Sequence, residues 1–395
     1  MSKYASILEK AQGLQATIVE WRRYFHERPE IALKELETAK RIKEILDELG
    51  LETKMMVNGT GVKAILKGGK PGKTFALRAD IDALPLQEET DVPYKSKNPG
   101  VMHACGHDAH AAMLLGAAKL LVQMQDTIPG NIVFLFQPAE ETGDGARPMV
   151  EEGALEGVNA IFAIHVYSSL PGGILGYKAG PLLAAGDFFD VKITGKGGHG
   201  GLPHLAIDPI AIVAQAITAL QTIVSREVDP LESAVISICK MEAGKGAYNV
   251  IPDAVTFGGT IRSHQPEMRA YLPQRIKEIL NGVVSGMRGT YEFNLLSKFP
   301  ALINEEKMTS FVVEVARELL GKDKVNEMKP LMGSEDFSYY LQKIPGTFVF
   351  LGVGNKEKGI VYPQHHPKFE LDEDVLPLGT ALHMAVALEY LQKAL

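Results

Sequence analysis

Three short apolar segments, separated by helical patterns, constrain the fold of this chain more than any other feature. Residues 74–79, 131–137 and 160–166 are nearly continuous hydrophobic runs, which are typical of strands buried on both faces of a sheet. Alternation of such strands with helices indicates an α/β domain. We therefore predict a central, mostly parallel sheet with helices on both faces.

Each of these strands ends in residues that active sites use. The first leads into Asp80 and Asp82, the second into Glu140 and Glu141, and the third contains His165. Parallel strands present their carboxyl ends at one edge of the sheet, where open α/β proteins bind their ligands. We expect these side chains to lie close together.

Ligands suited to a transition metal occur in the same part of the chain. Cys105 and His107 are one residue apart in a polar turn, so their side chains can converge on one point. Thiolate and imidazole are the donors that zinc and its first-row neighbours prefer. Glu141, His165 and His365 bring the set to five. Five ligands exceed the need of one tetrahedral ion, so a two-ion site is predicted.

Two acids next to these ligands have predicted supporting roles. Glu140 stays unligated beside the ions, where a general base would take a proton from an activated water and pass it to a leaving group. Asp108 follows His107 and is a candidate to accept the second ring N–H of a metal-binding histidine. His26, at the end of the first predicted helix, is interpreted as a packing or surface residue.

From about residue 184 the pattern changes. Its strands and helices follow the order β-α-β-β-α-β, which is the ferredoxin-like split unit. Because the α/β pattern precedes and follows this segment, we predict a discontinuous catalytic domain with an inserted α+β domain. The expected bounds are 1–183 with 297–395 for the catalytic domain and 184–296 for the insertion.

Composition excludes several classes of protein. A length of 395 residues favours two domains. The net charge of −7 and the lack of a basic run argue against nucleic-acid binding. No run of 18 apolar residues occurs, so no membrane partner is expected. Cys105 and Cys239 lie in different contexts, which argues against a disulfide framework and predicts a reducing, cytoplasmic location.

Eight motifs, taken in order, carry a resemblance to a known family. They are LRADIDALP, MHACGHDAH, FQPAEE, GGHGGLPH, NVIPD, GTIRS, MGSEDFSYY and HHPKFELDED. Over nearly its whole length the chain resembles the amidohydrolase branch of the binuclear-metal aminoacylase/carboxypeptidase family, which includes hippurate hydrolases and auxin-conjugate hydrolases. The resemblance implies a zinc-exopeptidase-like fold, an inserted lid and dimerisation domain, and a homodimer or homotetramer. It also implies two divalent ions per subunit, of zinc, manganese, cobalt or nickel.

The resemblance also assigns roles to individual residues. His199, in the lid loop, matches a histidine that stabilises the oxyanion, and Asn249 and Arg262 match residues that hold the substrate's carbonyl and free carboxylate. Asp80 stands where the wider family has an acid that orients a metal-binding histidine, which Arg78 replaces here. His366 is not counted as a ligand. The matched metal ligands are Cys105, His107, Glu141, His165 and His365, with Glu140 as the general base.

The implied activity is metal-dependent hydrolysis of N-acyl-L-amino acids, such as N-acetyl or N-benzoyl derivatives, to an amino acid and a carboxylic acid. A carboxypeptidase acting on short peptides and an N-acetyl-diaminopimelate deacetylase are the alternatives within the family. A binding protein that had lost catalysis should lack the base or several ligands, and this sequence keeps them all. A serine hydrolase is disfavoured because Ser334 lacks the second glycine of the nucleophile elbow.

Overall fold

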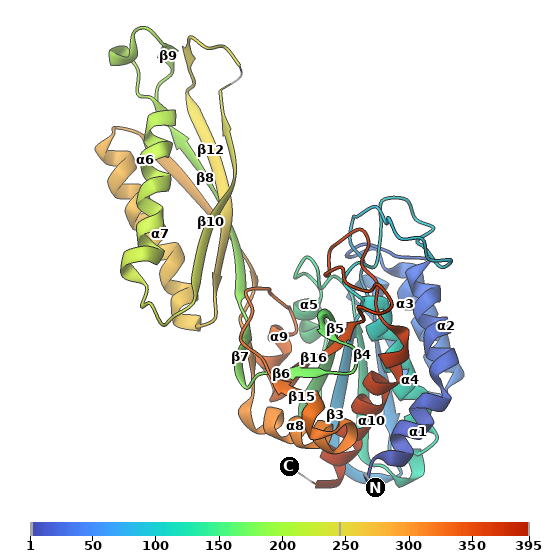
Figure 1. The fold of residues 1–395 in the computed structure, drawn as a ribbon. Coiled ribbons are helices and arrows are strands. Elements are labelled where there is room, and N and C mark those ends of the chain that lie inside the picture. Colours follow the sequence, from blue (N-terminus) through green and yellow to red (C-terminus); the bar gives the residue numbers. More distant parts are fainter. Residues whose placement is uncertain (1–2, 245, 394–395) are drawn as a thin grey trace. The chain divides into compact units, whose positions relative to one another are not determined.

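The computed structural model describes residues 3–244 and 246–393, which cluster into two compact units (Figure 1). Unit 1 comprises Met1–Leu182, Ile303–Lys329 and Asp336–Leu395, and unit 2 comprises Leu183–Leu302 and Pro330–Glu335. The short return segment 330–335 joins unit 2 because Gly333 accepts a backbone hydrogen bond from Ala184. Local sequence patterns gave no sign of that return.

Unit 1 is built on an eight-stranded sheet with the order β1-β2-β4-β3-β5-β16-β6-β15. Its four central strands run parallel, and Asp80 at the end of β3 pairs in register with Gln137 at the end of β4. The fold class predicted from the sequence is therefore confirmed. The strands are β1 (Glu52–Met56), β2 (Gly61–Lys67), β3 (Lys70–Asp80), β4 (Pro129–Gln137), β5 (Ala160–Pro171), β6 (Leu175–Tyr177), β15 (Val325–Glu327) and β16 (Gly346–Gly354).

Helices cover both faces of this sheet. On one face Phe162 of β5 contacts His383 of α10, with ring centroids 5.5 Å apart. On the other face Phe348 of β16 contacts Phe337, which directly precedes α9, at 5.7 Å. The helices are α1 (Ala5–Gly13), α2 (Gln15–His26), α3 (Leu36–Glu48), α4 (His107–Val122), α5 (Ala146–Glu151), α8 (Glu306–Leu320), α9 (Ser338–Leu341) and α10 (Leu376–Lys393).

Local patterns missed or merged a few elements of unit 1. The helix predicted over residues 4–28 is divided at Leu14 into α1 and α2. The edge strands β1, β6 and β15 were not predicted, because they are short and two of them are largely exposed. The last predicted helix corresponds to α10, and its final two residues, 394–395, lie outside the described part of the chain.

Unit 2 has a four-stranded antiparallel sheet with the order β10-β12-β8-β13, and α6 and α7 pack on one of its faces. This is the predicted β-α-β-β-α-β arrangement. A two-stranded ribbon of β9 and β11 adjoins it. Its elements are β8 (Ala185–Thr194), β9 (Gly198–His199), α6 (Pro209–Thr222), β10 (Ala234–Ala243), β11 (Val250–Ile251), β12 (Ala254–Ser263), α7 (Pro266–Gly286) and β13 (Thr290–Phe299); β7 (Gly180–Leu183) pairs with β14 (Leu302–Asn304).

Among the described residues, one helical segment, Pro209–Glu227, is long and apolar enough to cross a membrane by length and composition alone. Ile212, Val213, Ala216 and Leu220 of this segment are buried in the core of unit 2. Part of its apolar character is therefore explained by the core of unit 2.

Candidate metal centre

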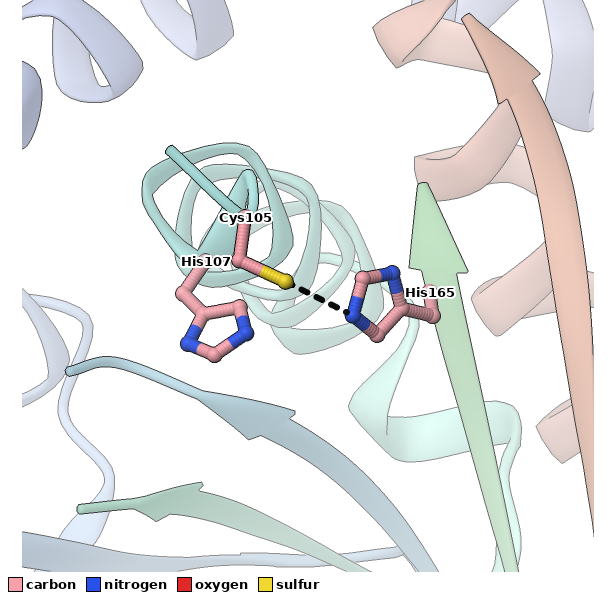
Figure 2. A group of neighbouring side chains, drawn as sticks. All are labelled: Cys105, His107 and His165. Atoms are coloured by element: carbon pink, nitrogen blue, oxygen red, sulfur yellow. Dashed lines mark hydrogen bonds between the residues drawn. The ribbon is translucent and has the colours of Figure 1, made fainter. Parts of the chain in front are cut away.

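Three of the predicted ligands meet where β5 passes the start of α4. Cys105 lies just before α4 and His107 is its first residue, and the Sγ atom of Cys105 lies 3.5 Å from Nε2 of His165 on β5 (Figure 2). Gly106 between them has a φ of +90°, and a Cβ there would lie only 2.3 Å from Val166 Cγ2. Only glycine fits this position, which lets Cys105 and His107 approach the same point.

Hydrogen bonds fix the orientation of both histidine rings. Nδ1 of His165 donates to the backbone oxygen of Val166 at 2.6 Å, which leaves its Nε2 facing Cys105. Nδ1 of His107 lies 3.1 Å from Oδ1 of Asp82. Its Nε2 is buried and has no hydrogen-bond partner among the described residues. Each ring thus presents Nε2, and a second hydrogen bond behind a metal-binding ring is the usual arrangement in metalloproteins.

Glu141 and His365 complete the group. Nε2 of His365 lies 3.4 Å from Oε2 of Glu141. The His365 backbone N–H donates to the carbonyl of Ala104 at 2.8 Å, which holds its loop beside the Cys105 turn. The Glu141 backbone N–H donates to Oδ2 of Asp82 at 3.0 Å. All five predicted ligands therefore lie together, although they come from four separated stretches of sequence.

Cys105 belongs to two sets of converging ligand atoms. One set contains Cys105, His107 and His165, the other contains Cys105, Glu141 and His365, and within each set the atoms lie within 4.8 Å of one another. Oε1 of Glu141 and Nε2 of His107 are both buried, and neither has a hydrogen-bond partner within the part of the chain that the structure describes. Unpartnered buried donors of these types, with a thiol between them, fit divalent cations.

The charge distribution also favours a cation. Burial raises the pKa of the Cys105 thiol and lowers the pKa of His165 well below its usual range, so that ring is neutral and able to bind a metal. Burial opposes the charged form of His107, yet Asp80, Cys105 and Asp82 raise its pKa well above the usual range. His107 therefore holds a proton beside several buried acidic groups. A metal ion would take the place of that positive charge.

Glu140 is buried beside these ligands. Its Oε2 lies 4.0 Å from Nε2 of His107, and Oε1 of Glu141 lies at the same distance from that atom. Glu140 belongs to neither of the two sets that share Cys105, although its ligand atom lies within 4.8 Å of those of His107 and Glu141. The geometry thus leaves one carboxylate next to the ligands and outside both sets.

The prediction that Asp108 orients a metal-binding histidine is wrong. Its Oδ2 accepts hydrogen bonds from Nε of Arg22 and Nδ1 of His26, each at 2.8 Å. Successive residues of a helix point about 100° apart, so the side chain after His107 is directed to α2 instead of the ligands. Asp108 joins the start of α4 to α2, and His26 belongs to this buried network, in keeping with its predicted packing role.

The acid that contacts His107 from behind is Asp82, which lies two residues after the predicted Asp80. Asp80 accepts a hydrogen bond from Nη1 of Arg78 at 2.6 Å and also pairs with Nδ1 of His110. Alternation along an extended strand places Asp80 and Asp82 on the same side, so the sequence identified the pair without distinguishing its members. Nε2 of His110 accepts from the Val166 N–H at 2.8 Å, which leaves neither of its ring nitrogens free for a metal.

In unit 2 the β9–β11 ribbon brings His199 and Asn249 together. His199 pairs with Val250, and the Gly200 N–H donates to the Asn249 carbonyl at 2.8 Å. Nδ1 of the exposed His199 ring accepts from the Gly201 N–H at 3.0 Å. A neutral His199 therefore carries its proton on Nε2, where it can be donated.

Arg262 lies elsewhere in unit 2, near the end of β12. It pairs with Gly186. The other end of β12 begins at Ala254, which pairs with Thr194. Thr194 lies a few residues before the β9–β11 ribbon, so the ribbon is near this other end. About eight residues of strand separate the two ends, or roughly 26 Å at 3.3 Å per residue. The predicted substrate-binding residues of unit 2 therefore form two separate groups. The ring of His366 stacks on that of Tyr362, with the ring centroids 4.5 Å apart.

Buried histidine, cysteine and glutamate side chains at the carboxyl edge of a parallel sheet define a hydrolase centre of the metal-dependent class. Comparison with known proteins agrees with this class. Residues 76–389 match Peptidase family M20/M25/M40, and the chain belongs to this family.

The relatives found are enzymes of related activities. An IAA-amino acid hydrolase (ILR1-like 4) of Arabidopsis thaliana is 46% identical over 374 residues, covering 94% of this chain and 84% of the relative. Thermostable carboxypeptidase 1 of Saccharolobus solfataricus is 44% identical, and the match covers 98% of this chain and 100% of the relative. N-acetylcysteine deacetylase of Bacillus subtilis is 41% identical, covering 96% and 98%. The solved structure of the Bacillus subtilis YXEP protein, a dinuclear metal binding peptidase, is 37% identical with a TM-score of 0.85. The match covers 96% of this chain and 99% of the YXEP chain.

Proposed function

We propose that this protein is a metal-dependent amidohydrolase that cleaves N-acyl-L-amino acids into an amino acid and a carboxylic acid. The observation that carries the proposal is the position of Glu140, buried next to two sets of metal-type ligands and outside both sets that share Cys105. Relatives that hydrolyse IAA–amino acids and N-acetylcysteine, at 46% and 41% identity, support acylated amino acids as the substrate class.

The residues of the protein, including those that a partner subunit supplies, divide the reaction among them. Divalent ions bound by the ligand sets would polarise the amide carbonyl and make water a stronger nucleophile. Glu140 accepts a proton from the attacking water on a carboxylate oxygen and donates it to the departing amine. His199 donates from Nε2 to the oxygen that becomes negative. Arg262 binds the free carboxylate of the amino acid through parallel N–H bonds.

We propose two divalent ions per subunit, drawn from zinc, manganese, cobalt and nickel. The two ligand sets that share Cys105 support this number, and the related YXEP protein is a dinuclear metal binding peptidase. The mixture of sulfur, nitrogen and oxygen donors suits all four metals. Cys105 and Cys239 are both free thiols, which supports the proposal of a reducing, cytoplasmic compartment.

A homodimer or homotetramer is proposed as the assembly. Strand β10 lies at an edge of the unit 2 sheet, and most of its residues after Ile238 are exposed. An amide and the carboxylate of the same amino acid are only a few ångströms apart, whereas the His199 ribbon and Arg262 are separated by roughly 26 Å of strand. One small substrate cannot contact both groups of a single chain, so a partner subunit would supply one of them.

Hydrolysis of short peptides is the second candidate. The carboxypeptidase of Saccharolobus solfataricus matches this chain over 98% of its length, and Arg262 would bind a peptide's terminal carboxylate as well as that of an acylated amino acid. N-acetyl-diaminopimelate is a narrower alternative within the same chemistry, and no separate observation favours it.

A substrate panel tests the proposed function. Purified protein supplied with one divalent ion at a time is offered N-acetyl- and N-benzoyl-amino acids, dipeptides and N-acetyl-diaminopimelate, and release of free amine is measured. We expect faster release from the acyl amino acids than from the dipeptides. Faster cleavage of the dipeptides would favour the carboxypeptidase, and no release from any substrate with any ion would refute the proposal.

A further inference from the structure

Glu35 directly precedes α3, and its side chain makes an unusual long-range contact. Oε1 of Glu35 accepts a hydrogen bond from the backbone N–H of Ala139 at 2.8 Å, and the residue is fully buried. Oε2 is also buried and has no hydrogen-bond partner in the described part of the chain. A buried carboxyl with half of its capacity unused is costly, so its retention calls for a specific role.

The peptide that Glu35 contacts lies immediately before Glu140. Ala139 has a φ of +53°, a left-handed conformation that costs an alanine about 1 kcal/mol. The turn is closed on its other side by the N–H of Asp144 bonded to the Ala139 carbonyl and the N–H of Gly143 bonded to the Glu140 carbonyl. The Glu35 contact satisfies the N–H of the one residue that carries the strain. It therefore holds the backbone in the conformation that sets the direction of Glu140.

Capping of α3 does not explain Glu35. Its side chain makes no capping hydrogen bond to the helix that it precedes. Glu30 makes the capping hydrogen bonds instead. Its Oε2 accepts from both the backbone N–H and the Oγ1 hydroxyl of Thr38, each at 2.8 Å. The two acids at the start of α3 thus have separate partners, one within the helix and one beside Glu140.

The protonation state of Glu35 suggests which substitute can replace it. Burial, followed by repulsion from Asp82, raises the pKa of Glu35 to about 8, so its carboxyl is mostly neutral at pH 7. A glutamine has the same length, is also neutral, and keeps an oxygen that can accept from Ala139. An aspartate keeps the carboxyl but is shorter by one methylene group.

We propose that Glu35 is a positioning residue for catalysis, which holds the Ala139 peptide in its left-handed conformation and so directs the Glu140 carboxylate. The proposal rests on the proposed function of Glu140 as the general base. It assigns no proton transfer to Glu35 itself. Turnover then depends on whether the side chain at position 35 is long enough to bring an acceptor oxygen to the backbone N–H of Ala139.

The test compares Glu35→Asp, Glu35→Gln and Glu35→Leu, with Glu30→Gln as the matched control at the same helix end. Glu35→Asp and Glu35→Leu should lower kcat by about 100-fold, the scale of a misplacement near 1 Å, with KM and bound metal nearly unchanged. Glu35→Gln should keep kcat within about threefold of wild type. Glu30→Gln should lower the melting temperature and leave kcat unchanged, because it weakens α3 without touching Ala139.

Equal kcat values for Glu35→Asp and Glu35→Gln, whether both high or both low, would overturn the proposal. These two variants decide the matter if Glu35→Leu does not fold. Amide hydrogen exchange at Ala139 gives a readout independent of turnover, with faster exchange expected in Glu35→Asp and not in Glu35→Gln. Unchanged exchange in both would also overturn it. A wild-type protein inactive on every acyl amino acid would refute the proposed function, while the exchange result would still test the contact.

Discussion

Oδ1 of Asp82 lies 3.1 Å from Nδ1 of His107, and this contact turns Nε2 of the same ring to the candidate metal centre. Oδ2 of Asp82 accepts the backbone N–H of Glu141 at 3.0 Å. One buried carboxylate therefore positions two of the five ligands, one through its ring and one through its main chain. It also favours the ring form that leaves Nε2 free for a metal.

Replacing Asp82 with Asn should weaken metal binding. An amide can still face His107, but it lacks the negative charge that makes the ring a stronger ligand, so we expect a loss of metal affinity of about 10–100-fold. The measurement is a competition between the protein and a chelator of known affinity. Asp108→Asn is the control, since Asp108 is equally buried and contacts Arg22 and His26 instead of the ligands. Unchanged affinity in Asp82→Asn would show that Asp82 does not support the site.

Replacing Glu140 with Gln should abolish turnover and leave metal content intact. The amide is the same size and cannot accept the proton of the attacking water, so kcat should fall by about 100-fold or more. Metal content per subunit is measured on the same sample. Substantial residual activity in the variant would rule out Glu140 as the base.

Replacing Arg262 with Ala should act selectively on substrates that have a free α-carboxylate. Loss of a charge-assisted pair costs about 2–3 kcal/mol, or roughly 30–150-fold in kcat/KM. The comparison is between an N-acyl amino acid and its C-terminal amide, which the wild-type protein should already cleave more slowly. Equal losses on both substrates would mean that Arg262 does not bind the carboxylate.

Asp108→Asn should destabilise the fold, most clearly near neutral pH. Burial opposes its charge, yet Arg22 and His26 hold the pKa of Asp108 far below its usual range. Because the folded-state pKa is depressed, the stabilisation is present above the unfolded-state pKa, near 4, and is lost as the pH falls towards the folded-state value. Removing one member of this buried cluster should cost about 3 kcal/mol at pH 7.

Urea unfolding of wild type and Asp108→Asn at pH 7 and at pH 3, which lies below the unfolded-state pKa, measures this contribution. We expect the difference in unfolding free energy between the two proteins to shrink at the lower pH. A difference independent of pH would mean that the Asp108 charge contributes nothing and that the variant acts through packing alone.

Much of the fold could be predicted because its long elements have strong local periodicity. The strand ending at Gln137 is a nearly continuous apolar segment, and it formed where predicted. The edge strand β1 alternates between exposed and half-buried residues, and its pairing with β2 and its contacts with α3 hold it in place. Edge strands of this kind depend on tertiary contacts that a local pattern does not encode.

The sequence predicted the metal ligands of the site, but it did not predict the residues that hold those ligands in position. Cysteine, histidine and paired glutamates are rare enough at strand ends to be noticed, and all five proposed ligands converge. Glu35 gave no signal, because its partner is a backbone N–H 104 residues away. The prediction for Asp108 was wrong because consecutive residues of a helix point in different directions, so Asp108 does not face the same side as His107. Supporting contacts of this kind depend on side-chain direction and long-range packing, which appear only in the folded structure.

The most direct test of a two-ion amidohydrolase is a metal titration of the apo-protein, with turnover of an N-acyl amino acid followed in parallel. Protein freed of metal by chelation is given increasing equivalents of zinc, manganese, cobalt or nickel. We predict no activity without metal and full activity at two equivalents per subunit. Hydrolysis that persists in the fully metal-free protein, or that no divalent ion restores, would contradict it.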